Sequence, residues 1–306
     1  MKLKLLFLTL TILFLLSSPA LAGKYEEGQT AMDKKAFKKA ILLFEWDAKK
    51  GNPKSQYKLA TIYHNGQGVK KNLPKAAYWY EMAAKQGHPE AQHAIGCMYQ
   101  KGQGVAKDDK QAKTWFELAS KNGTAAAQYD LGMIYQTGQG VPRDYNQALY
   151  YYELAARQGY AKAQTAIGLL YADGLCKTKD YKQAASWFDL AARQGDPSGQ
   201  FNLGVLNEKG LGFPQNYQEA ARWYKLAAKQ EYADAQNNLG FLYYNGKGVT
   251  KDLIISYALF SLAYDNGNPD AFQNCYIAAS DLPPKSHQKA KALAGDRQKL
   301  YALIGE

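Results

Sequence analysis

Residues 123–158 read GTAAAQYDLGMIYQTGQGVPRDYNQALYYYELAARQ, and this pattern recurs every 36 residues. A glutamine, a glycine and a large aromatic residue each keep the spacing independently. Internal periods of this size are typical of stacked supersecondary units, each of which buries its apolar face against its neighbours. Six such units cover residues 51–266. The three registers are Gln56, Gln92, Gln128, Gln164, Gln200 and Gln236; Gly66, Gly102, Gly138, Gly174, Gly210 and Gly246; and Trp79, Trp115, Tyr151, Trp187 and Trp223.

Each unit is predicted to form two antiparallel helices, which we call helix A and helix B. Helix A of the quoted unit places Leu131 and Tyr135 four residues apart on one face. Helix B follows Asp144, and an Asn or Asp, the preferred N-cap types, recurs at this place in all six units. Helix B often ends in a basic residue followed by Gln-Gly, as at Arg157, where the cation offsets the helix dipole. The period therefore predicts an all-α solenoid of helix pairs.

The glycines between helix A and helix B allow two interpretations. Gly-x-Gly beside a lysine, as at Gly66 and Gly68, can cradle a phosphate, but such a loop normally follows a strand, and no strand pattern precedes any copy. Glycine adopts positive φ freely, so a turn that reverses the chain is favoured. The fourth copy, Gly174 to Lys177, lacks the second glycine and is expected to be less regular. A glycine inside helix A, such as Gly96, predicts the close approach of a neighbouring helix.

The two ends of the chain depart from the period. Residues 1–22 combine a short basic start, an apolar run of about 12 residues and an Ala-x-Ala ending, which predicts a bacterial secretory signal peptide cleaved after Ala22. This run is too short for a transmembrane helix, which needs roughly 20 residues. Residues 23–50 are expected to form a preceding helix pair. Residues 267–306 are expected to supply one more helix A, a Pro-Pro break and a capping helix from about Ser286.

The charge of the chain is basic. It carries 38 Lys and Arg against 27 Asp and Glu, a formal net charge of +11 that falls to +9 without residues 1–22. Many of these cations lie at helix C-termini, where they have a structural role. The excess suits an anionic partner such as peptidoglycan, lipid headgroups or an acidic protein, whereas nucleic acid is not expected for an exported chain. We therefore expect a protein that is periplasmic or secreted.

The unit resembles the Sel1-like repeat, a relative of the tetratricopeptide repeat. The resemblance lies in the motif A-Q-x-x-L-G-x-x-Y, in a G-x-G-V turn followed by Asp or Asn, and in A-x-x-W-[FY]-x-x-A-A. Residues 127–135 and 184–192 show the first and last of these motifs. The resemblance covers residues 51–266, and residues 23–50 are closer to the tetratricopeptide form. It implies a right-handed superhelical solenoid of antiparallel helix pairs, with a concave groove lined by helix A.

The resemblance also implies a protein-interaction scaffold that binds a protein or peptide in this groove and has no chemistry of its own. Bacterial exported members resemble adaptors for envelope enzymes or host proteins. Some cysteine-rich relatives carry a β-lactamase or penicillin-binding label, so a hydrolase acting on β-lactams or peptidoglycan is a second hypothesis. A serine β-lactamase needs Ser-x-x-Lys with Ser-Asp-Asn and Lys-Thr-Gly; Ser55 and Ser286 begin Ser-x-x-Lys matches, but the other motifs do not occur. A peptidoglycan-associated adaptor is a third hypothesis.

No cofactor or metal is expected, and the chain is expected to be a monomer and not an enzyme. His88 and His93 are five residues apart, which is not the i, i+4 spacing of a helical metal site, and the three cysteines form neither a disulfide framework nor a CxxC pair. Cys97 is interpreted as half-buried apolar surface and Cys275 as core. Cys176 lies in a turn and is the cysteine expected to be exposed.

The surface of helix A that lines the expected groove, here called the groove face, lies beside the core stripe of Leu59 and Tyr63. Its residues vary between units while the skeleton repeats, and they are aromatic, apolar or amide-bearing, which is typical of a recognition surface. The alternative is that some of them pack against the neighbouring repeat. The candidate binding residues are Tyr57, His93, Tyr129, Phe201, Asn237, His64, Gln100, Gln136 and Tyr244.

Overall fold

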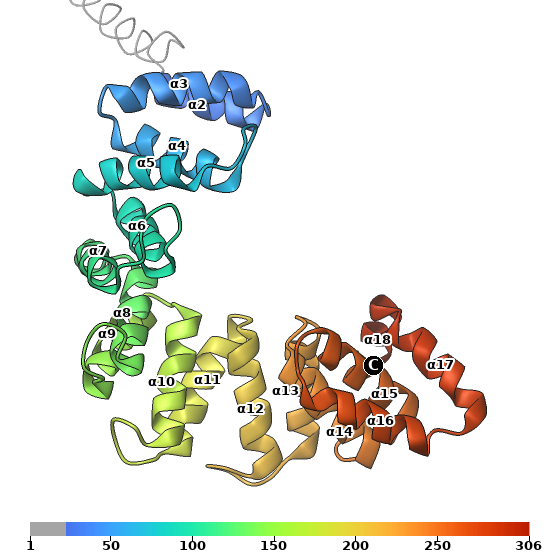
Figure 1. Cartoon of the computed structure of the whole chain (residues 1–306). Coiled ribbons are helices and arrows are strands. Elements are labelled where there is room, and N and C mark those ends of the chain that lie inside the picture. The colour runs from blue at the N-terminus through green and yellow to red at the C-terminus, as the bar shows by residue number, and fades with distance from the viewer. Residues whose placement is uncertain (1–22, 306) are drawn as a thin grey trace, which may run out of the picture. The chain divides into compact units, whose positions relative to one another are not determined.

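The structure is a computed structural model that describes residues 23–305. The predicted signal peptide, residues 1–22, lies outside the described residues. Within them every regular element is a helix, and none of these helices is both long enough and apolar enough to cross a membrane. The helices are α2 (Lys24–Asp33), α3 (Phe37–Lys49), α4 (Pro53–Asn65), α5 (Leu73–Lys85), α6 (Pro89–Lys101), α7 (Asp109–Lys121), α8 (Ala125–Thr137), α9 (Tyr145–Arg157), α10 (Ala161–Asp173), α11 (Tyr181–Arg193), α12 (Pro197–Lys209), α13 (Tyr217–Ala228), α14 (Ala233–Asn245), α15 (Leu253–Asp265), α16 (Asp270–Asp281), α17 (Pro284–Ala294) and α18 (Arg297–Leu303) (Figure 1).

Successive helices pack as antiparallel pairs, as the period predicts. The pairs α2 with α3, α4 with α5, and α6 with α7 follow one another in a first compact unit that ends at Leu131. A second compact unit begins at Gly132, within α8, and contains the pairs α10 with α11, α12 with α13, and α14 with α15. Within each unit a pair contacts the next pair along the chain.

The start of every helix B is fixed by the side chain predicted to cap it. Asn72 accepts a hydrogen bond from the backbone N–H of Lys75 at 3.0 Å, and Asp108 accepts one from that of Gln111 at 3.0 Å. Such a bond satisfies an N–H group that has no partner inside the helix and contributes about 1 kcal/mol. The predicted caps are confirmed in the remaining units at Asp144, Asp180, Asn216 and Asp252.

The glycine pair forms the turn between helix A and helix B. Gly66 and Gly68 have φ angles of 73° and 70°, in the left-handed region that glycine adopts without strain. The second glycine also lies against backbone, because a Cβ at Gly104 would come 2.4 Å from the carbonyl carbon of Leu73. The less regular fourth copy is confirmed, since Cys176 at the second position is not among the described residues with positive φ. The geometry of the turn accounts for both glycines of this pair without a bound phosphate.

A large ring of helix B fills the space left by the glycine inside helix A. A Cβ at Gly168 would lie 2.5 Å from Cε1 of Phe188, and Phe188 is fully buried. The predicted close approach is therefore confirmed. The buried ring is the residue directly after the tryptophan position of each repeat, as Phe188 follows Trp187. The tryptophans themselves are only half-buried. The other pairs of glycine and ring are Gly28 with Phe44 in the preceding helix pair, Gly96 with Phe116, Gly132 with Tyr152, Gly204 with Tyr224, and Gly240 with Phe260.

The glutamine register makes polar connections between repeats. Gln92 is buried, and its Nε2 donates to the carbonyl of Ala84 in the last turn of α5 at 3.1 Å. Its Oε1 accepts a bond from Nδ2 of Asn122, just beyond α7, at 2.9 Å. One side chain thus links three helices and gives a second hydrogen bond to a last-turn carbonyl that also accepts the backbone N–H of Gly87 at 2.9 Å. Equivalent pairs of bonds are made by Gln56, Gln164, Gln200 and Gln236.

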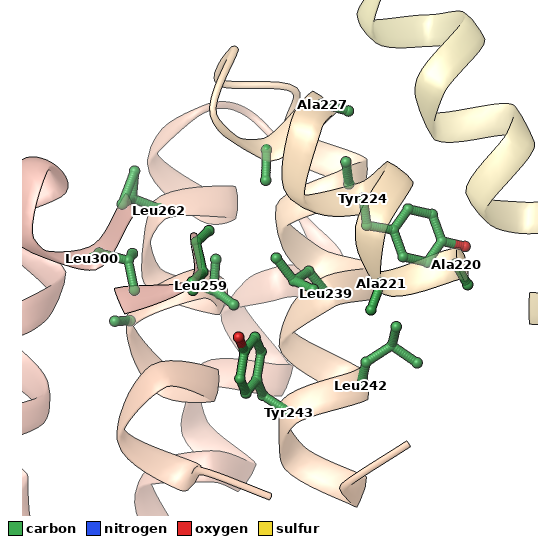
Figure 2. Packing of buried hydrophobic residues seen from close by; sticks show 14 of the residues in the cluster. Ala220, Ala221, Tyr224, Ala227, Leu239, Leu242, Tyr243, Leu259, Leu262 and Leu300 are labelled. Atoms are coloured by element: carbon green, nitrogen blue, oxygen red, sulfur yellow. The ribbon is translucent and has the colours of Figure 1, made fainter. Parts of the chain in front are cut away.

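The C-terminal helices close the core of the second unit. The predicted capping segment is two helices rather than one: α17 starts at Pro284 instead of Ser286, and α18 follows a new N-cap at Asp296. An Asp after a glycine favours this restart because its side chain caps a helix better than it continues one. Leu300 of α18 (Figure 2) and Ile304, which directly follows this helix, are fully buried in this core.

Replacing Gln92 with leucine is expected to lower the free energy of unfolding by about 1–3 kcal/mol, because buried polar groups lose their partners. The matched control is Gln111→Leu on the exposed surface of α7, where we expect a change below about 0.5 kcal/mol. Urea denaturation followed by tryptophan fluorescence measures both variants. Equal stability of the two would show that the glutamine bonds do not hold the stack together.

Candidate functional site

The candidate binding residues lie on helices A, partly inserted between neighbouring elements. The repeat-equivalent positions of Tyr57, His93 and Tyr129 fall on α4, α6 and α8 of the first unit, and those of Phe201 and Asn237 on α12 and α14 of the second. Packing between repeats, the alternative considered for this face, therefore holds in part, and a role in binding stays a prediction. Half-buried candidates are Tyr57, His93, Tyr129, Phe201, His64, Gln100, Gln136 and Tyr244, and Asn237 is buried.

Two aromatic candidates are held in place by other rings. Tyr57 stacks on His88 with ring centroids 4.7 Å apart, and burial raises the pKa of Tyr57. Phe201 lies between Tyr224 and Tyr232, with centroid distances of 5.8 Å and 5.3 Å. Rings at these separations interact in preferred orientations. Each of these two candidates is therefore an immobilised ring that is still partly open to solvent.

The polar candidates are tied to nearby side chains. Gln136 Oε1 accepts a hydrogen bond from the hydroxyl of Tyr152 at 2.5 Å, and the hydroxyl of Tyr244 donates to Asp281. Burial, assisted by nearby lysine charges, lowers the pKa of His64, so its imidazole is neutral at pH 7. The polar group at this position of helix A therefore differs among His64, Gln136 and Tyr244.

A polar bridge to the next helix A recurs at the position of His93. Nε2 of His93 on α6 lies 2.7 Å from Oδ2 of Asp130 on α8. Asn237 makes the equivalent bridge in the second unit, where its Oδ1 accepts a bond from Nδ2 of Asn274 at 2.8 Å. Both bridges join residues 37 apart in the sequence. The position therefore connects consecutive helices A in both units.

Cys97 joins His93 and Asp130 in a group of three side chains. Its Sγ lies 3.6 Å from Nε2 of His93, one turn earlier on α6, and 4.0 Å from Oδ2 of Asp130. The His93 and Asp130 side chains are 26% and 25% exposed, so solvent reaches the group. Burial opposes a charge on His93, but the bond to Asp130 and the contact with Cys97 outweigh burial and raise the pKa of His93 to about 10. The imidazole is therefore positively charged at pH 7.

Two members of this group were missed by the sequence patterns. Cys97 was interpreted as half-buried apolar surface, and it is half-buried, but it has polar contacts. Its i, i+4 spacing from His93 was the signal that could have identified the pair. Asp130 follows Tyr129, the repeat-equivalent of His93, so the stacking of repeats brings it next to His93.

The remaining candidates for chemistry are poorly placed. Cys176, expected to be exposed, is half-buried, and burial raises the pKa of its thiol. Cys275, expected in the core, is also only half-buried. Ser55, the first Ser-x-x-Lys serine, is fully buried, and its Oγ donates to Oδ2 of Asp47 at 2.5 Å. A substrate cannot reach Ser55 in this fold, which weighs against the hydrolase hypothesis at this motif.

Comparison with known families identifies the repeat. The Sel1 repeat model matches six consecutive segments, which begin two residues later than the units predicted from the period. None of the curated proteins compared with the chain matches it. The matched segments are residues 53–88, 89–124, 125–160, 161–196, 197–232 and 233–268.

Solved structures share the fold. The chain is 30% identical to a Sel1 repeat protein from Oxalobacter formigenes, with a TM-score of 0.74 over 79% of this chain and 97% of that one. It is 27% identical to c5321, described as a protective antigen present in uropathogenic Escherichia coli strains displaying an SLR fold, with a TM-score of 0.54 over 92% of this chain and 70% of that one. These likenesses and the helical structure confirm the predicted all-α solenoid class.

The His93 imidazole is expected to stay protonated through neutral pH and to titrate near pH 10. Because the folded pKa is raised above the ordinary value of 6.5, the stability gained from this proton is fully present below about pH 6.5 and is lost as the pH rises towards 10. Proton NMR of the histidine ring in chelator-treated buffer measures the titration. Asp130→Asn should lower the pKa of His93, and an unchanged pKa in that variant would contradict the assigned cause.

Proposed function

The chain belongs to the Sel1 repeat family, whose members generally mediate protein–protein interactions, and on this basis we propose that it is an exported scaffold that binds a protein or peptide on its groove face. The partner would belong to the cell envelope or to a host. The candidate residues named above would make the contacts, and the scaffold itself would catalyse no reaction.

The observation that carries this proposal is the presence of immobilised, partly exposed rings on helices A. Aromatic side chains dominate many protein interfaces because they offer a large contact area and few rotatable bonds. Tyr57 and Phe201 are already held by His88, Tyr224 and Tyr232. The side-chain entropy of these two rings was therefore lost when the chain folded. A partner that binds them would lose little further entropy.

The polar groups of the groove face support selectivity for one partner. The repeats present a charged His93, a neutral His64 and an amide at Gln136. A ligand that runs along the repeats of the first unit would have to match both His64 and His93. Mismatched charges and unpaired polar groups at an interface reject other ligands. The proposal is therefore recognition of a particular partner rather than general adhesion.

Export is supported by residues 1–22 and by the description of c5321 as a protective antigen. The protein recovered from a periplasmic or secreted fraction should begin at Gly23, because the signal peptidase recognises Ala-x-Ala before that residue. Intact-mass spectrometry reads the N-terminus, and Ala22→Arg, which blocks cleavage, is the control. Recovery of a chain that still carries residues 1–22 from the cytoplasmic fraction alone would count against export.

A peptidoglycan-associated adaptor is the second candidate, and the net charge of +9 without residues 1–22 favours it. Peptidoglycan is anionic, so its attraction to a basic protein should weaken steeply with salt. Co-sedimentation with purified sacculi at low and high salt tests this. Retention at 0.15 M salt that is insensitive to Phe201→Ala would favour the sacculus over a protein partner.

Phe201→Ala is expected to weaken binding of the protein partner by about 1–3 kcal/mol, in the range typical of interface truncations. The partner is first identified by affinity capture from envelope extract, and binding is then measured by titration beside a thermal melt. Leu226→Ala, at an exposed leucine of α13, is the matched control and should change neither quantity. Phe188→Ala removes a buried ring and should lower the melting temperature most.

Loss of binding by Phe201→Ala with a small melting shift supports the groove face as the binding surface. If the loss of binding is matched by a large fall in the melting temperature, Phe201 instead packs between repeats. An equal loss of affinity in Leu226→Ala would move the binding surface to the helices B.

A further inference from the structure

We propose that His93, Cys97 and Asp130 form a binding site for Zn²⁺, with a fourth coordination position open to solvent. The three side chains offer one imidazole nitrogen, one sulfur and one carboxylate oxygen within 4.8 Å of one another. Two of the ligands lie one helical turn apart on α6, and the third comes from the next helix A, α8. His93 also belongs to the groove face, but the metal site and its test need no binding partner.

The distances between the donor atoms are close to those of a tetrahedral zinc site. Zinc bonds of about 2.0–2.3 Å at tetrahedral angles separate sulfur from nitrogen by about 3.6 Å and nitrogen from oxygen by about 3.3 Å. The Cys97–His93 distance is 3.6 Å, the Cys97–Asp130 distance is 4.0 Å and the His93–Asp130 distance is 2.7 Å. A tetrahedral site also separates sulfur from oxygen by about 3.6 Å, so the Asp130 oxygen must move roughly 0.6 Å away from the His93 nitrogen and roughly 0.4 Å towards the Cys97 sulfur, which small side-chain rotations supply.

The same geometry argues against a nucleophilic triad of cysteine, histidine and aspartate. In such a triad the thiol and the carboxylate bind opposite nitrogens of the imidazole, so that the ring can pass a proton from one side to the other. Here the Cys97 sulfur and the Asp130 oxygen both approach Nε2 of His93. Three donor atoms that converge on one point suit a cation, and no proton path leads from the thiol through the ring.

The donor set selects the metal. Thiolate and imidazole together favour zinc over magnesium and calcium, which take oxygen ligands. The site is partly exposed, so an ion can enter from solvent. Phe116, fully buried beneath it, packs its ring 5.7 Å from the His93 ring and restricts its orientation. The fold therefore brings the ligand side chains together before an ion binds, and the ion displaces the protons of His93 and Cys97.

The other repeats indicate that bridging alone does not require these residues. Asn237 and Asn274 occupy the positions of His93 and Asp130 and join their helices with a neutral amide bond. The position of Cys97 is Phe241 in that repeat. An amide pair thus suffices to connect two helices A, whereas the first unit combines three metal-ligating residue types at the same place.

The test is titration of the untagged, chelator-treated chain with Co²⁺, followed by competition with Zn²⁺. We expect one Co²⁺ per chain, with visible bands of a tetrahedral ion and a near-ultraviolet band from a thiolate–cobalt bond, and displacement by one equivalent of Zn²⁺. Cys97→Ser should abolish the near-ultraviolet band. His93→Gln and Asp130→Asn should each weaken Zn²⁺ binding at least about 10-fold, since each removes or neutralises a ligand.

The matched control is the double variant Cys176→Ser, Cys275→Ser, which keeps the proposed ligands and should bind like the original chain. Circular dichroism verifies that each variant is folded. Zn²⁺ should also raise the melting temperature of the original chain and of the control, but not of Cys97→Ser. A near-ultraviolet band that survives in Cys97→Ser, or one that disappears in the control, would place the metal elsewhere. The absence of stoichiometric binding in the original chain would refute the site.

Discussion

The stack depends on how a helix that ends inside it satisfies its last carbonyls. A surface helix leaves these groups to water, but here the end of one helix B is covered by the next helix A. Two donors meet this constraint at Ala84: the backbone N–H of Gly87 and the buried side chain of Gln92, which also accepts from a side chain at the end of its own helix B. The bonds have direction and fixed length, so they set the register between helices that apolar contacts alone would leave free to slide.

Close packing adds a second constraint of a different kind. The glycine within helix A permits a ring of helix B to approach to a distance that any side chain would block. The polar bonds fix one end of each pair and the ring fixes its middle. The groove face is under neither constraint, and the residue at the position of His93 changes from repeat to repeat.

The helix pairs could be predicted because their signals are local. The cap at Asn72 and the turn at Gly66 act within a few residues, and both are where the sequence placed them. The choice between Trp115 and Phe116 as the buried ring could not be made from the period, because neighbours on a helix point about 100° apart and both keep the spacing. The contact of His93 with Asp130 spans 37 residues. This contact depends on the rotation of one helix A relative to the next. That rotation is set by packing between repeats, so it cannot be predicted from the sequence of one helix.

The offsets of the glutamine bonds bear on how such a chain changes its length. Gln56 reaches a carbonyl 8 residues before it and accepts from a side chain 30 residues after it, and Gln92, Gln164, Gln200 and Gln236 repeat both offsets. Gain or loss of a whole 36-residue segment, by unequal exchange between repeated stretches of a gene, recreates both offsets at the new junction. Gain or loss of any other length breaks them. The array can therefore grow or shrink in whole repeats without new compensating residues, while each added copy is free to diverge on its groove face.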